Sequence, residues 1–181
     1  MDDTHIYVLY DSKTGQPLAV HSVLAEDGNA ARVPLKRARE ELLLAAEVDP
    51  NRKVAVLEVT IPHRRSPWDY YVDLKQKRLV PKPTLRIEAQ THELEGDGED
   101  STRLDISVVD ERGRISRGFA GEVVVATSRG RLSERGGRVP LKNGKASLFL
   151  RSAPETVNQV VVAAYDPAER CLPGTVELSF V

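Results

Sequence analysis

Apolar and polar residues alternate through most of the chain from residue 84 onward. Short alternating runs are separated there by turn sequences rich in Gly, Asn and Asp, and helical periodicity does not occur. Strands with turns about every 8–12 residues are typical of an immunoglobulin-like β-sandwich. The pattern predicts seven strands, at residues 84–91, 102–109, 122–127, 138–141, 146–151, 159–165 and 175–180.

The first 80 residues combine two periodicities. Two apolar runs around a polar loop that contains Gly15 predict a β-hairpin. The next segment has apolar residues at every third or fourth position, which predicts an amphipathic helix that lies on a sheet and ends before Pro50. A β-branched strand and a second hairpin follow. The predicted order is ββαβββ, with strands at residues 6–10, 17–24, 53–61, 68–74 and 78–80 and the helix at residues 34–49.

The segment Pro81-Lys-Pro83 lies where the two patterns meet. Two prolines around one residue favour a stiff, extended connector and interrupt strand pairing. We therefore expect a small α+β domain at residues 1–80, followed by an all-β immunoglobulin-like sandwich at residues 84–181.

Three turn motifs in the second half resemble those of bacterial immunoglobulin-like domains of the invasin and intimin type. They are Val108-Val-Asp-Glu-Arg-Gly113, Gly121-Glu-Val-Val-Val-Ala-Thr-Ser-Arg-Gly130 and Asn143-Gly-Lys-Ala146, the last followed by a terminal pair of apolar strands. The resemblance covers residues 84–181 and implies a rigid spacer or binding module, of the kind found in surface adhesins and phage structural proteins. Residues 1–83 resemble no family that we recognise.

Charge and composition give no sign of a polyanionic or membrane partner. The chain has 181 residues, and 26 Lys and Arg against 27 Asp and Glu give a net charge of −1. This balance does not favour binding to nucleic acid, and no apolar run is long enough to span a bilayer. The acidic start, Met1-Asp-Asp-Thr-His5, is unlike the basic start of a signal peptide, so we expect cytoplasmic synthesis.

Known catalytic and metal-binding motifs do not occur in the sequence, so we expect a non-enzyme without a cofactor. The four histidines lie in separate segments, and Cys171 is the single cysteine, so no intrachain disulfide forms. The acidic stretch at residues 93–100 is the best metal candidate, since its carboxylates could surround Ca²⁺. It lacks the order of a formed calcium loop, and a solvated hairpin loop is the alternative.

The segment at residues 63–71 interleaves basic and aromatic side chains. Arg and Trp are enriched in protein–protein hot spots, so Arg64, Arg65, Trp68 and Tyr70 are the predicted protein-binding residues. The same combination can stack bases and neutralise phosphates. In a third interpretation Trp68 and either Tyr70 or Tyr71 close the core of the first domain, and the arginines are solvated.

These observations favour a non-catalytic structural or interaction protein. Its immunoglobulin-like module would dock on, or project from, a larger assembly such as a phage-type particle, through a protein partner or self-assembly. Two alternatives stay open: a nucleic-acid-binding accessory protein that uses the 63–71 segment, and an enzyme whose site lies in the first domain.

Overall fold

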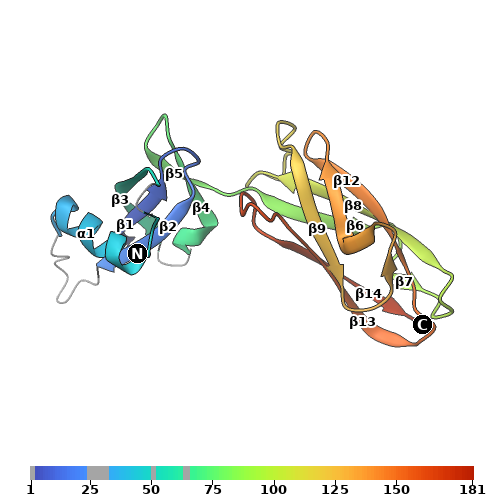
Figure 1. Ribbon diagram of the computed structural model, residues 1–181. Helices are drawn as coiled ribbons and strands as arrows, with labels where there is room; N and C mark the ends of the chain where they lie inside the picture. The colour runs from blue at the N-terminus through green and yellow to red at the C-terminus, as the bar shows by residue number, and fades with distance from the viewer. Residues whose placement is uncertain (1–2, 24–32, 50–51, 63–65) are drawn as a thin grey trace. The chain divides into compact units, whose positions relative to one another are not determined.

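A computed structural model describes residues 3–23, 33–49, 52–62 and 66–181. The chain divides into two compact units, unit 1 at Met1–Pro81 and unit 2 at Lys82–Val181. No sheet crosses the junction in the described residues, because β5 (Arg78–Pro81) pairs only within unit 1 and β6 (Thr84–Ala89) only within unit 2 (Figure 1).

Unit 1 is built on a three-stranded antiparallel sheet in the order β2-β1-β3. Alternation along the central strand sends Tyr7 and Leu9 to one face, where they pack against Ala38 and Leu42 of the helix. The hydroxyl of Tyr7 donates a hydrogen bond to the carbonyl of Val33 just before that helix. These elements are β1 (Asp3–Asp11), β2 (Pro17–Val23), α1 (Leu35–Ala45) and β3 (Val54–Pro62).

The opposite face of this sheet is apolar as well. It carries Ile6 and Val8, and Leu79 of β5 packs against them. Leu79 belongs to the hairpin of β4 (Tyr70–Asp73) with β5. The first turn also reaches this hairpin: Gly15 has φ 75°, and a Cβ built on it would lie 2.1 Å from the carbonyl oxygen of Val72. Glycine is thus required there for both its φ and its lack of a side chain.

Two details of the predicted first domain are wrong. The helix ends at Ala45 rather than Asp49, because Glu47 has φ 46°, a left-handed conformation that cannot continue a helix. Leu44, the next-to-last residue of this helix, is 82% exposed. Trp68 is not in a strand, since it lies in a 3₁₀ turn, η1 (Pro67–Asp69).

Asp11 ties the first turn to the segment before β3. Its carboxylate accepts hydrogen bonds from the backbone N–H groups of Lys13 and Thr14, and the Arg52 Nε lies 2.7 Å from its second oxygen. The Arg52 guanidinium and then the Lys13 N–H lower the pKa of Asp11 to about 2. The carboxylate therefore stabilises this turn only in its ionised form.

Unit 2 is a sandwich of two sheets, in the strand orders β10-β12-β8-β6 and β11-β9-β13-β14-β7. The first has the D-E-B-A order of an immunoglobulin domain, and β9, β13 and β14 occupy its C, F and G positions. The strands beyond β6 are β7 (Glu93–Leu94), β8 (Ser101–Val109), β9 (Gly121–Thr127), β10 (Arg131–Leu132), β11 (Arg138–Leu141), β12 (Lys145–Arg151), β13 (Val157–Tyr165) and β14 (Gly174–Phe180), with a 3₁₀ turn, η2 (Arg135–Gly137), between β10 and β11.

All seven predicted strands occur, but the unit contains nine. The two missed strands, β7 and β10, have two residues each, too few for an alternating pattern to be visible. The predicted strand at residues 138–141 is β11, which adds to the edge of β9. The short β10 lies beside β12 in the D position. The chain thus passes from β9 in one sheet to β10 in the other and then back to β11, which pairs with β9.

The core of unit 2 lies between its sheets. Leu104, Ile106 and Val108 of β8 face inward from one sheet, and Val162 and Phe180 face them from the other. All five side chains are at most 1% exposed. Burial of such side chains contributes about 1.5–3 kcal/mol each relative to full exposure, so this layer is the main source of stability for the unit.

A charged cluster fixes the loop between β13 and β14. The buried carboxylate of Asp166 accepts hydrogen bonds from the backbone and the guanidinium of Arg170. Burial raises the pKa of Asp166, but these bonds outweigh it and the net pKa is lowered. Arg170 also lies over the Phe119 ring, 4.6 Å from its centroid, and donates to the carbonyl of Ala120. The cluster therefore connects this loop to the segment before β9.

The Asn143-Gly144 turn has positive φ at both positions, 53° and 72°, as a two-residue hairpin turn requires. The flanking strands belong to different sheets, so their pairing stops at the Lys142–Lys145 bridge. The turn is tied instead to the segment before β9, since Gly144 donates to the carbonyl of Phe119. A Cβ on Gly144 would lie 2.5 Å from the Ser116 oxygen.

Replacing Gly144 by Ala should destabilise unit 2 through both φ and steric overlap, by about 2–3 kcal/mol. Gly113 offers a matched control, because it has φ 73° but no atom within 4 Å of a built Cβ. Gly113→Ala should cost only about 1 kcal/mol. Urea denaturation followed by circular dichroism measures both, and equal losses would refute the close approach at Gly144.

Replacing Asp11 by Asn should lower the free energy of unfolding of unit 1 by about 1–2 kcal/mol at neutral pH, because the Arg52 ion pair is lost. The folded-state pKa of Asp11 is lowered, so its contribution is present above the unfolded-state pKa near 4 and is lost as the pH falls through about 2. Denaturation followed by the fluorescence of Trp68 measures the difference in free energy of unfolding between wild type and variant. A difference that stays the same on acidification contradicts the assignment.

Candidate protein-binding surfaces

Trp68 lies on the surface of unit 1 in a fixed turn. Ser66 precedes the 3₁₀ turn, and its side-chain oxygen accepts a hydrogen bond from the backbone N–H of Trp68. The backbone N–H of Asp69 donates to the Ser66 carbonyl, and Pro67 restricts the first position. Trp68 is nevertheless 48% exposed. Trp68 is thus an aromatic side chain held at the surface by an ordered backbone.

The structure separates Tyr70 from Trp68, although both are predicted to contact the same partner. Tyr70 is only 7% exposed and belongs to the buried face of β4, so it is not available for contact with a partner. Tyr71, on the other face of that strand, is 36% exposed. Arg64 and Arg65 lie outside the described residues. The core interpretation therefore holds for Tyr70 and is wrong for Trp68.

The acidic stretch at residues 93–100 uses its aspartates to order its own backbone. Asp97 accepts hydrogen bonds from the N–H groups of Glu99 and Asp100, and Asp100 accepts from those of Glu95 and Ser101. The Glu99 and Asp100 N–H groups lower the pKa of Asp97. Within the described part of the chain no group of three or more His, Cys, Asp or Glu side chains is placed to hold a metal ion.

The described histidines make separate contacts. His5 lies 2.9 Å from Glu58, His21 lies 3.9 Å from Glu41, and His92 bonds the backbone carbonyl of Glu177. His63 lies outside the described residues. Cys171 is 6% exposed, and burial raises the pKa of its thiol to about 12. Such a thiol is protonated at neutral pH and is a poor nucleophile.

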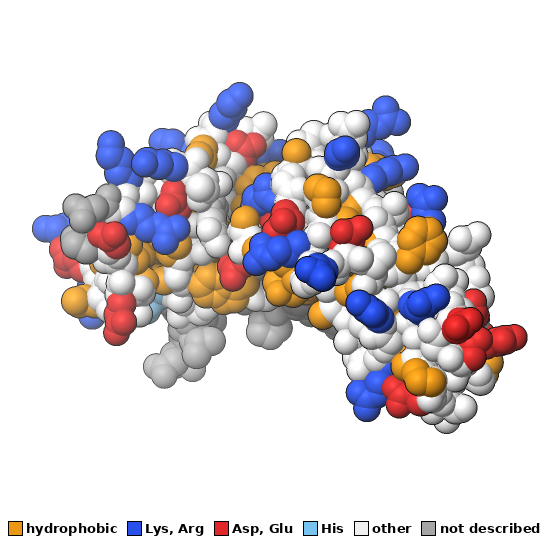
Figure 2. Space-filling model, turned by 45° about the vertical axis from the view of Figure 1, so that its right-hand side comes forward, with side chains coloured by type: hydrophobic (Ala, Val, Ile, Leu, Met, Phe, Trp, Pro, Cys, Tyr) orange, Lys and Arg blue, Asp and Glu red, His pale blue; other side chains and the backbone are white. Residues whose placement is uncertain are grey.

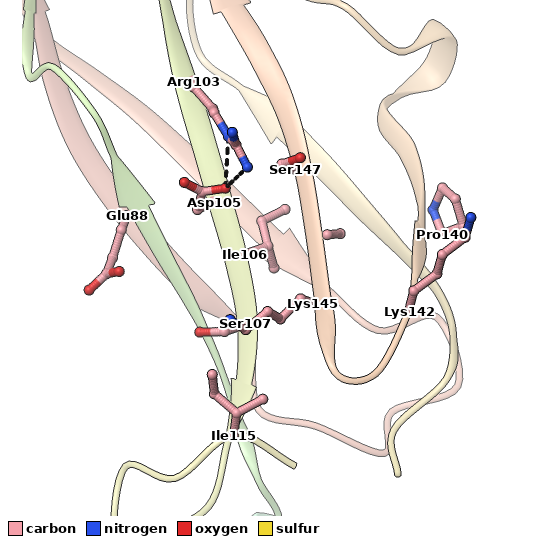
Figure 3. Close-up of a pocket in the computed structure, with 11 residues that line it drawn as sticks. Glu88, Arg103, Asp105, Ile106, Ser107, Ile115, Pro140, Lys142, Lys145 and Ser147 are labelled. Carbon is pink, nitrogen blue, oxygen red and sulfur yellow. Dashed lines mark hydrogen bonds and ion pairs between the residues drawn. The ribbon is translucent and has the colours of Figure 1, made fainter. Parts of the chain in front are cut away.

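The outer face of the β10-β12-β8-β6 sheet carries a groove of about 590 Å³ (Figure 3). Ser147, Asp105 and Glu88 follow one another across its strands in register. Arg103 forms an ion pair with Asp105, at 2.9 Å. Charged side chains of both signs line this groove together with the apolar residues Ile106, Ile115, Pro140 and Ala146, so it favours no single class of ligand.

A second groove, of about 340 Å³, lies on the same outer face around Phe149. We call it the Phe149 groove, and Phe149 is 52% exposed in it. Arg131 and Arg151 pair directly across β10 and β12. Neither guanidinium is within ion-pair distance of a carboxylate in the described residues, although Arg151 lies 3.4 Å from the Glu99 carbonyl oxygen. The groove is lined by Ser101, Arg131, Leu132, Ser133, Phe149 and Arg151.

Sequence reasoning missed this second groove, although one signal was present. In the run Leu148-Phe149-Leu150, alternation buries the two leucines and turns the phenylalanine outward. The partnership of Arg131 with Arg151 had no such signal, because β10 is too short to be recognised. Acidic, basic and apolar side chains lie next to one another on the surface of unit 2 (Figure 2).

Comparison with known proteins supports the fold alone. No protein-family description and no curated protein matches the chain by sequence. A glycosyl hydrolase family 2 member from Bacteroides cellulosilyticus is similar in structure, with a TM-score of 0.51 and 14% identity over 97% of this chain. This chain spans only 21% of that protein's length.

Two structures of intimin are also similar. The D0-D1 domain of intimin matches 75% of this chain and 58% of its own, with 17% identity and a TM-score of 0.42. A 282-residue C-terminal fragment of intimin, solved with the intimin-binding domain of its receptor Tir, matches 52% of this chain and 31% of its own, with 21% identity and a TM-score of 0.41.

Among the described helices, none is long and apolar enough to cross a membrane.

Cys171 should be unreactive in the native protein. A thiol-specific reagent such as dithionitrobenzoate should label it slowly at neutral pH and rapidly in denaturant, because burial keeps it protonated and out of reach. The absorbance of the thiolate that the reagent releases measures both rates of labelling. Rapid stoichiometric labelling without denaturant would show that the segment before β14 opens readily.

Proposed function

We propose that this protein is a non-catalytic interaction module. Its immunoglobulin-like unit 2 acts as a rigid body that docks on, or projects from, a larger assembly such as a phage-type particle. Unit 1 supplies a contact centred on Trp68. The exposure of this tryptophan on an ordered turn is the observation that carries the proposal.

Trp68 suits a binding anchor for a physical reason. Contact between the apolar indole and water is unfavourable, so burial of the ring against a partner would lower the free energy of the complex. Because Ser66 and Pro67 already order its backbone, binding would freeze few additional torsions. Tyr71, which is 36% exposed, lies in β4 directly after this turn.

Arg64 and Arg65 precede the turn by a few residues. We propose that they contribute to the same contact with the partner, because arginine is enriched at hot spots. Tyr70 supports the contact from inside the core instead of touching the partner, since it is buried.

Replacing Trp68 by Ala should leave unit 1 folded and weaken partner binding by a factor of about 30 or more, corresponding to a loss of about 2 kcal/mol. Tagged wild type and variant are compared for retention of cross-linked partners from the source lysate, identified by mass spectrometry. Light scattering of both purified proteins reports self-assembly. Circular dichroism confirms that the variant is folded.

Leu74→Ala is the matched control, because Leu74 is also an exposed apolar side chain, at 39%. It should retain partners nearly as well as wild type, whereas Arg64→Ala combined with Arg65→Ala should reduce retention. Equal retention by the tryptophan variant and wild type would refute a contact at Trp68. Salt-dependent binding of a labelled single-stranded DNA by wild type would instead assign the segment to nucleic acid.

A further inference from the structure

We propose that the Phe149 groove of unit 2 binds an acidic, extended segment of a protein partner. One carboxylate of the segment bridges Arg131 and Arg151, and an apolar side chain two residues away covers Phe149. This site adds a second contact to the proposed interaction module. It lies in a different unit from Trp68, so each contact can fail without the other.

The arginine pair is the first observation. Arg131 and Arg151 are direct partners across antiparallel strands, where like charges destabilise the pairing. No carboxylate in the described residues pairs with either guanidinium. A partner carboxylate between the two forks would accept a hydrogen bond from each and remove the repulsion, which is the geometry that guanidinium groups favour.

Phe149 is the second observation. Its side chain stands on the solvent face of β12, 52% exposed, whereas its strand neighbours Leu148 and Leu150 are buried. Its backbone is fixed on both sides of the peptide: the N–H donates to the Ser133 side-chain oxygen, and the carbonyl accepts from the Ser133 N–H. The ring is thus held by a rigid edge of the sandwich, which reduces the entropy cost of binding.

The spacing of these groups defines the ligand. Phe149 and Arg151 are two residues apart on one face of a strand, about 6–7 Å along it. In an extended peptide, residues i and i+2 share a face with the same spacing. An apolar residue followed two positions later by Glu or Asp therefore matches the groove.

The acidic stretch at residues 93–100 limits where acidic residues of the ligand can lie. Arg151 donates to the Glu99 carbonyl and pairs with Ser101, so the end of this stretch, Glu99 and Asp100, adjoins the arginine pair on the side away from Phe149. Further acidic residues of a ligand would be repelled there. The favoured ligand therefore places its acidic residue at the arginine pair and not beyond it.

The test is an NMR titration of the ¹⁵N-labelled full chain with a synthetic peptide, acetyl-Gly-Ser-Phe-Ser-Glu-Ser-Gly-amide. Changes in amide chemical shift should saturate with peptide concentration and should be confined to residues of the Phe149 groove. Peptide affinity should fall as salt is added. The same peptide with Gln in place of Glu, or with Ser in place of Phe, should bind at least ten times more weakly.

Variants connect the shifts to the proposed contacts. Arg131→Gln combined with Arg151→Gln should weaken peptide binding at least tenfold, as should Phe149→Ser. Arg112→Gln, which removes one positive charge from the exposed turn before Gly113, should bind like wild type, and Arg131→Gln alone, which also removes one charge, should bind more weakly. The spectra of the free variants report directly whether each is folded.

Absence of shifts at saturating peptide, or equal binding of the Gln peptide, would overturn the proposal. Equally strong shifts with inorganic phosphate alone would also overturn it, because they would show an anion site without peptide selectivity. None of these outcomes affects the retention of partners through Trp68, so the two proposals are tested separately.

Discussion

The two-residue period of the β-strand governs both the core and the surface of unit 2. Along β8, one parity places Leu104 and Ile106 in the buried layer, and the other places Arg103 and Asp105 in solvent. A shift of one residue in pairing would exchange the two sets. The burial of the apolar layer therefore fixes which charged groups meet on the outer face.

Alternation was also the property most readable from the sequence. The seven longer strands of unit 2 were predicted because each is long enough to show it, and the Asn143-Gly144 turn because its two residues adopt positive φ most easily. Trp68 was misread because Ser66 and Pro67 start a 3₁₀ turn that breaks the phase of the strand. In the strand itself the phase holds, with Tyr70 and Val72 buried.

The candidate sites were less predictable, for a different reason. Exposure of Phe149 follows from the pattern of its own strand, but the meeting of Arg131 and Arg151 depends on pairing between segments 20 residues apart. Likewise Asp166, a single acidic residue in a loop, becomes part of a buried cluster only when Arg170 and Phe119 come together. Local patterns do not contain such partnerships.

The position of β14 in the sheet has a consequence for synthesis. This strand lies between β13 and β7, and Phe180 at its end is fully buried between the sheets. A nascent chain that has reached residue 173 therefore has an unpaired β13 edge and an incomplete apolar layer. Because an open strand edge and exposed apolar side chains favour association, we expect a nascent unit 2 to be prone to aggregation until residues 174–180 have paired.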